Sequence, residues 1–327
     1  MQKFKRSLTS MALALCGLLA AGTAAAAYPE GPVKVIIPFA PAAGTDAMFR
    51  QIAPFIEKEL RVRLILENRS GANGDIGNEF AARAAPDGYT LVVNSTNLVL
   101  SPLLQKDPKY SLERSFVPIS KLATSPLVMA ASARSPFRTP AEFVAYARQN
   151  PGKLNYGGVG AGSPPDLMAE VVKMRTNTEF VTVLYRGMGP VLVDLMGGNV
   201  DFTFSGLLAV KQHFESGVLR PIAVTGTSRA AILPTVPTFA ESGIDVSPML
   251  AGTWWGLFAP IGTPEPIVRT LNEAIGRALA DPQLIKRLED GGYTPARTTP
   301  QQFAADLAQE GVIWRQMVPR LAASVPR

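Results

Sequence analysis

The sequence predicts an α/β protein of two lobes, each a sheet flanked by helices. Short β-branched runs alternate with amphipathic helical patterns, and the alternation restarts near Pro126. After Ser247 only one strand and three helices remain, too few for a domain, so we expect them to complete the first sheet. This predicts two crossovers, near 125–128 and 246–251, with a ligand cleft between the lobes.

Residues 1–27 have the pattern of a secretory signal peptide. A basic start precedes the apolar run Met11–Gly22 and a small-residue cleavage site that ends at Ala27. The apolar run is shorter than the ~20 residues of a spanning helix, which argues against a retained anchor. Cys16 raises a lipoprotein alternative, but Leu15 stands where a small residue is expected. We therefore expect cleavage after Ala27 and export.

The composition excludes several classes of protein. The chain of 327 residues carries 32 basic and 26 acidic side chains, and removing Lys3, Lys5 and Arg6 with the leader leaves 29 against 26. A net charge of +3 is too small to indicate nucleic-acid binding. The mature chain has no cysteine, so it depends on a core that about 300 residues can supply. Two domains are expected at this length.

The first block begins with a β-α-β-α-β alternation, which predicts a parallel sheet with helices on both faces. Pro54 lies inside the first helical pattern and should kink or split that helix. The expected elements are a strand 33–39, a helix 47–60, a strand 63–67, a turn 68–74, a helix 75–85 and a strand 89–94.

The second block continues the alternation, and its first helix has Thr139 as N-cap and Pro140 at the first helical position. The expected strands are 127–131, 153–157, 180–185, 200–204 and 220–224, and the expected helices are 139–149, 165–175, 190–196 and 207–215. A strand 254–259 and helices 265–279, 282–290 and 300 to about 321 follow. We assign 28–126 and 248–327 to lobe 1 and 127–247 to lobe 2.

Two loops are candidate ligand contacts because each follows a strand and precedes a helix. In PFAPAAGTDAMF, residues 38–49, small side chains leave helix N–H groups open to an anion. A tight turn is the plain alternative, and Asp46 can act there as a first-turn helix carboxylate. The loop 157–163 lacks both nucleotide glycine fingerprints, so a wall that accepts a carboxylate is the better interpretation. Ser163 is a helix N-cap, a ligand donor or both.

Catalytic motifs are nearly absent from the sequence. His213 is the only histidine and lies in a polar helix end, which favours a surface residue and excludes a histidine-rich metal site. Neither G-x-S-x-G nor H-E-x-x-H occurs. Asp194 and Asp201 sit in separate elements, and Trp254-Trp255 fits a cleft lining and a core strand equally well. We expect no catalytic residue, no metal and no cofactor.

A series of short motifs resembles one family over essentially the whole mature chain. They are Tyr28-Pro29 with Val33 to Phe39, Pro41 to Asp46, Asn68 to Gly74 with Ile76-Gly77, Pro86 to Thr90, Asn155 to Ser163, Tyr185 to Gly187 with Gly189-Pro190, Leu195 to Asp201, and Trp255-Gly256 with Ala259-Pro260 and Gly262 to Pro264. In this order they resemble the Bug extracytoplasmic solute receptors of tripartite tricarboxylate transporters. The resemblance implies a periplasmic binding protein of type II, expected as a monomer, that closes on a small carboxylated solute.

The resemblance also implies which residues contact the ligand. The solute carboxylate would meet main-chain groups and waters in the two loops, and polar positions elsewhere would contact the variable end. The implied residues are Phe39, Ala40, Ala42, Ala43, Gly44, Asp46, Ser95, Asn97, Gly158, Val159, Gly160, Ala161, Gly162, Ser163, Arg186, Asp201 and Ser205.

This chain departs from the family pattern at three places. Ala42-Ala43 replace two glycines, Pro164-Pro165-Asp166 stand where a histidine is frequent, and Arg186 replaces the commoner lysine. An arginine can hold a carboxylate with two hydrogen bonds, so a dicarboxylate or an aromatic carboxylate is the expected ligand. The expected partner is a membrane permease. The alternatives are a sensor kinase and, from a different class, a secreted hydrolase that uses His213 and a serine.

Overall fold

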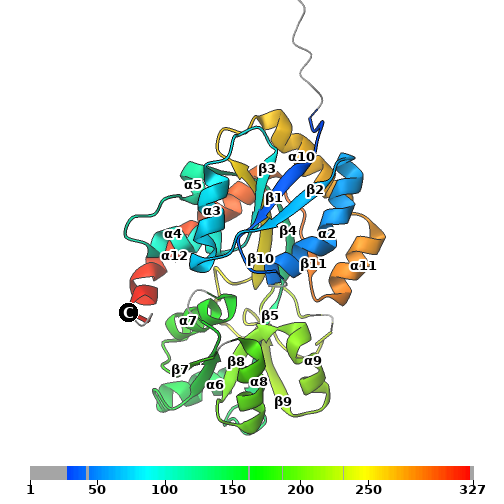
Figure 1. Ribbon diagram of the computed structural model, residues 1–327. Helices are drawn as coiled ribbons and strands as arrows, with labels where there is room; N and C mark the ends of the chain where they lie inside the picture. Colours follow the sequence, from blue (N-terminus) through cyan, green and yellow to red (C-terminus); the bar gives the residue numbers. More distant parts are fainter. Residues whose placement is uncertain (1–27, 42–43, 161–162, 186, 231, 325–327) are drawn as a thin grey trace, which may run out of the picture.

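The computed structural model describes residues 28–324 except 42–43, 161–162, 186 and 231, with side chains as far as Pro319. The predicted leader lies outside this range. Figure 1 shows two lobes, one above the other, each with a sheet flanked by helices. The strands are β1 Val33–Ile37, β2 Leu64–Asn68, β3 Thr90–Asn94, β4 Phe116–Ser125, β5 Leu127–Ser132, β6 Asn155–Gly158, β7 Val181–Leu184, β8 Phe202–Gly206, β9 Leu219–Val224, β10 Thr253–Pro260 and β11 Thr294–Pro295.

Most helices coincide with the amphipathic patterns of the sequence. The helix bounds are α2 Gly44–Leu60, α3 Asp75–Ala82, α4 Asn97–Leu104, α5 Leu112–Ser115, α6 Pro140–Gln149, α7 Pro164–Thr176, α8 Met188–Gly197, α9 Leu207–Glu215, α10 Glu265–Ala278, α11 Pro282–Asp290 and α12 Pro300–Ser324. Of these helices, α4 and α5 were not predicted. Pro54 lies within α2, which is assigned as one helix. The Thr139 side chain accepts a hydrogen bond from the Glu142 N–H, as its position before α6 predicts. In the described part of the chain, no helix combines the length and apolar character needed to span a membrane.

The predicted parallel pairing is confirmed for the first three strands, but both sheets are mixed because later strands join them antiparallel. Among the described residues, the first sheet has the order β11-β4-β10-β3-β1-β2 and the second β7-β6-β8-β5-β9. Strands β1, β2 and β3 are parallel, and so are β6, β7 and β8. Strand β10 runs antiparallel to β3 and β4, and β5 runs antiparallel to β8 and β9. Local sequence patterns do not encode these long-range directions.

Side-chain alternation buries both faces of each sheet. In β1, Val35 and Ile37 face a cluster with α2, α10 and α11, whereas Ile36 faces a cluster with α3, α4 and α12. In β5, Val128 faces α8 and α9, and Met129 faces α6 and α7. The cluster that contains Ile36 also contains Met129, so one apolar core includes residues of both lobes.

The chain passes between the sheets at two segments that touch. Strand β4 continues through Pro126 directly into β5. The return passes through Gly252, at φ +73°, where a Cβ would lie 2.3 Å from the Ser125 carbonyl oxygen and 2.9 Å from the Leu127 nitrogen. Only glycine fits both this backbone conformation and this close approach. The exact lobe boundaries, 126/127 and 247/248, remain predictions.

Candidate functional site

The carboxyl ends of the parallel strands in both lobes lie toward the crossovers. In the first sheet, Gly256 pairs with Asn94, so the end of β3 lies near the start of β10, which follows the return crossover. In the second sheet, Leu127 pairs with Gly206, so the end of β8 lies beside the outgoing crossover. The loops that follow β1 and β3 therefore face the loops that follow β6 and β8. This is the edge where α/β sheets bind ligands.

Asp46 is held within a polar network at the start of α2. The Arg50 Nε–H donates to both oxygens of the buried Asp46 carboxylate, at 2.9 and 2.8 Å, and the Asn68 side chain donates to Oδ1 at 2.9 Å. The Asn68 amide also donates to the Phe39 carbonyl at 3.0 Å. The network therefore ties the entry of the first loop, at Phe39, to its exit at Asp46.

The rest of the first loop divides between exposed and buried residues. Ala40 and Gly44 are exposed, while Ala42 and Ala43 lie outside the described residues. Thr45 is buried and accepts a hydrogen bond from the Trp255 indole at 3.1 Å. That bond fastens the first turn of α2 to the start of β10.

The turn after β3 rests on a chain of buried polar side chains that the sequence did not indicate. Ser95 and Asn97 are both buried, and the Ser95 N–H donates to the Asn94 side chain at 2.8 Å. The Asn94 amide donates to Asn78 at 2.7 Å, and Asn78 donates to the Tyr110 hydroxyl at 2.8 Å. Such a satisfied network fixes the turn, because each group would be costly to bury alone.

The second loop already holds a carboxylate from its own chain. Asp166 Oδ2 accepts hydrogen bonds from the N–H groups of Val159, at 3.1 Å, and Gly160, at 2.7 Å. It also accepts one from the Ser163 hydroxyl at 2.7 Å. Gly158 is buried beneath this carboxylate, while Ala161 and Gly162 lie outside the described residues. Sequence reasoning noted Asp166 as a family departure and missed this contact.

The remaining expected contacts lie at two different ends of the second lobe. Ser205 is buried near the carboxyl end of β8, and Arg186 lies outside the described residues. Asp201 precedes β8 at its opposite end, four residues from Ser205, or about 13 Å along a strand. Its carboxylate accepts from the Asn155 N–H at 2.7 Å, and burial raises its pKa. The structure therefore does not bring Asp201 together with Ser205.

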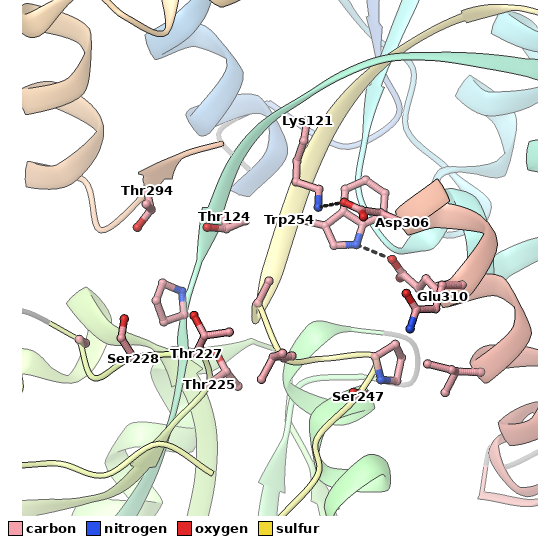
Figure 2. A pocket seen from close by; sticks show the side chains of 18 of the residues that line it. Lys121, Thr124, Thr225, Thr227, Ser228, Ser247, Trp254, Thr294, Asp306 and Glu310 are labelled. Atoms are coloured by element: carbon pink, nitrogen blue, oxygen red, sulfur yellow. Dashed lines mark hydrogen bonds and ion pairs between the residues drawn. The ribbon is translucent and has the colours of Figure 1, made fainter. Parts of the chain in front are cut away.

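A cavity of about 550 Å³ lies between the lobes, beside the crossovers. Figure 2 shows it between Thr124 of β4, the loop after β9, Ser247 and α12. None of the expected ligand contacts that the structure describes lines it. In it, Lys121 pairs with Asp306 at 2.8 Å. The cavity therefore borders the crossovers rather than the two candidate loops.

Glu310 is the titratable group of this cavity whose environment is most unusual. Its oxygens accept hydrogen bonds from the indoles of Trp314 and Trp254, each at 2.9 Å. Burial raises the pKa of Glu310 to about 7, against the opposing effect of the two indoles. The Trp254 bond is drawn in Figure 2 and joins α12 to the start of β10.

Trp254 and Trp255 take the core role that the sequence left open. Both are buried core residues. Trp254 also lines the crossover cavity.

His213 is half-buried near the end of α9, away from the strand edges. Within the described residues, no group of His, Cys, Asp and Glu side chains is arranged to hold a metal ion.

Comparisons with known proteins agree with this geometry. The model of the tripartite tricarboxylate transporter family receptor matches residues 48–321. Protein BugT of Bordetella pertussis is 32% identical over 309 residues, which cover 94% of each chain. Rpa4515 of R. palustris, solved with adipate, superposes with a TM-score of 0.74 and is 31% identical, covering 90% of this chain and 98% of that one. MatC of Rhodopseudomonas palustris, solved with bound malate, has a TM-score of 0.72 and 30% identity, covering 89% of this chain and all of that one.

The family match spans most of the chain, and the solved relatives superpose over both lobes. Together with the two facing strand edges, they establish what kind of protein this is. The chain belongs to the tripartite tricarboxylate transporter receptor family, the Bug solute-binding proteins.

Proposed function

We propose that this receptor captures a small carboxylated solute between its lobes and delivers it to the membrane subunits of a tripartite tricarboxylate-type transporter. The proposal rests on the two strand edges, one in each lobe, that face each other. Each has a loop that leads into a helix N-terminus, where N–H groups and the helix dipole favour an anion. Relatives that carry adipate and malate support a carboxylated ligand.

Ligand capture requires that the closed arrangement of the lobes gain contacts that the open one lacks. A solute that touches both the first loop and the second lobe stabilises closure by its differential affinity for the closed state. The close contact at Gly252 provides a narrow connection about which the lobes can rotate. No enzymatic step is part of this function.

Isothermal titration against mono-, di- and tricarboxylates and aromatic acids tests ligand capture. The protein is first unfolded, dialysed and refolded to remove any acid that co-purifies, and that acid is identified by mass spectrometry. We expect at least one acid to bind, and X-ray scattering to show a smaller radius of gyration with it. Absence of binding to every acid would refute the proposal.

Delivery to a permease is separated from signalling by transport measurements. Vesicles that contain the permease should take up the labelled acid only when this receptor is added. Capture of a sensor kinase with no stimulation of uptake would favour the signalling alternative. The proposed location is the periplasm, after removal of residues 1–27, and mass spectrometry of the exported chain should find Tyr28 at its N-terminus.

A further inference from the structure

The environment of Asp166 bears directly on which solutes the second lobe accepts. The carboxylate lies at the start of α7, at the third helical position, and reaches back to N–H groups six and seven residues earlier. An N-terminal carboxylate that only caps its helix would bond to the first turn. Asp166 instead occupies donors of the loop that faces the first lobe.

The surrounding residues are shaped to hold this carboxylate. Asp166 is only 7% exposed, and a Cβ on Gly158 would lie 2.3 Å from its Oδ1 atom. Glycine at this position therefore makes room for the carboxylate. The Tyr156 side chain is fully buried, and burial together with the nearby Asp166 charge raises the pKa of Tyr156.

Two further buried oxygens of this group, Asp166 Oδ1 and the Tyr156 hydroxyl, belong to residues that interact with each other. The interaction with the Asp166 carboxylate adds to burial in raising the pKa of Tyr156. The three donors on Oδ2 fix the negative charge of this buried carboxylate at the loop.

We propose that Asp166 determines ligand class by filling the second lobe's amide loop with the chain's own carboxylate. A second solute carboxylate at this loop would find the N–H groups of Val159 and Gly160 already bonded and would be repelled by a like charge. The receptor therefore selects solutes that carry one carboxylate toward the first lobe. Their other end is neutral, or bears a hydrogen-bond donor or a positive charge.

This inference rests on the proposed capture of a carboxylated solute and narrows it. It favours the aromatic carboxylates over the dicarboxylates among the ligands that the sequence suggested. In the unliganded protein, the Asp166 carboxylate accepts the hydrogen bonds of this loop that a ligand carboxylate would otherwise accept.

The test uses probes that differ only in the charge of one end. For chains of four to eight carbons, titrations compare each dicarboxylate with its monoamide and with the ω-amino acid of equal length. Wild-type protein should bind the monoamide or the amine more tightly than the dicarboxylate. Asp166→Asn retains an acceptor for the loop and should shift the affinity ratio toward dicarboxylates by about tenfold or more.

A matched control separates this effect from net charge. Glu179→Gln removes the same charge from an exposed position just before β7, at the opposite end of the lobe, and should leave the ratio unchanged. Wild-type preference for dicarboxylates, or a ratio unaltered in a folded Asp166→Asn variant, would overturn the inference while carboxylate capture stands. Failure of wild type and both variants to bind any acid would instead refute the proposed function.

Discussion

The stability of this receptor should depend on pH through Glu310, and the structure supplies the magnitude. A glutamate has an ordinary pKa of about 4.5, and burial raises that of Glu310 to about 7. The folded protein therefore holds the proton more tightly than the unfolded chain. The stability that this preference contributes is fully present below pH 4.5 and is lost as pH rises through 7.

The size of the effect follows from the difference between the two pKa values. A difference of 2.5, at about 1.4 kcal/mol for each pKa unit, corresponds to about 3 kcal/mol of unfolding free energy. Because Glu310 lines the crossover cavity and is partly exposed there, solvent screening makes this value an upper bound.

The assay is urea unfolding of wild-type protein and the Glu310→Gln variant between pH 4.5 and 8.5. Glutamine stays neutral, so the wild-type advantage over the variant should fall by up to about 3 kcal/mol, mostly between pH 5 and 7.5. Coincident fluorescence and circular-dichroism transitions are required for this comparison. Glu273→Gln, at an exposed position of α10, is the matched control for loss of one carboxylate. Two parallel stability curves for wild type and Glu310→Gln would refute the reasoning.

Three further substitutions test the packing that positions the site. Gly252→Ala forces a Cβ against the outgoing crossover at φ +73° and should cost about 2 kcal/mol or more in urea unfolding, so an unchanged midpoint would contradict the described contact. Phe202→Ala removes a ring from the buried aromatic cluster of the second lobe and should cost about 3–5 kcal/mol, whereas Val193→Ala, at a 64% exposed position, should cost under about 0.5 kcal/mol. Trp255→Phe removes the indole N–H bond to Thr45 and should lower the free energy of unfolding by about 1 kcal/mol beyond any packing loss. A double-mutant cycle with Thr45→Val measures the coupling between the two residues, and a coupling energy of zero would exclude that bond.

Much of the fold was predictable because local signals agreed with tertiary packing. The bounds of α9 and α11 match the predicted helices 207–215 and 282–290. The Thr139 cap of α6 was also predicted correctly. Side chains of Thr139 and Asp281 cap α6 and α11, and α9 directly follows a strand, so the local pattern was sufficient.

The missed elements lacked such signals. Strand β4 includes Pro118 and several polar residues, and helix α4 contains Pro102 and is apolar on most sides. In neither segment do apolar residues recur at a spacing that distinguishes a strand from a helix. The antiparallel direction of β10 depends on where the chain returns from the second lobe, which no local pattern records.

The candidate loops were predictable, and their internal partners were not. Small residues between a strand and a helix indicated both loops. The bond between Asp46 and Asn68, however, joins residues 22 positions apart. The Asp166 contact had a weak signal, an acidic residue three positions after a serine cap in a glycine-rich loop. Predicting this contact from the signal would require knowing that the loop folds back toward Asp166.

The adjacent entry and exit of the second sheet make that sheet a cassette with neighbouring ends. The Leu127 N–H donates to the Thr225 hydroxyl and the Thr225 N–H donates to the Leu127 carbonyl, each at 2.9 Å. A segment whose ends are joined this way could be exchanged between relatives if its residues in the shared core, such as Met129, were kept. Recombining such cassettes would mix half-sites of different ligand preference.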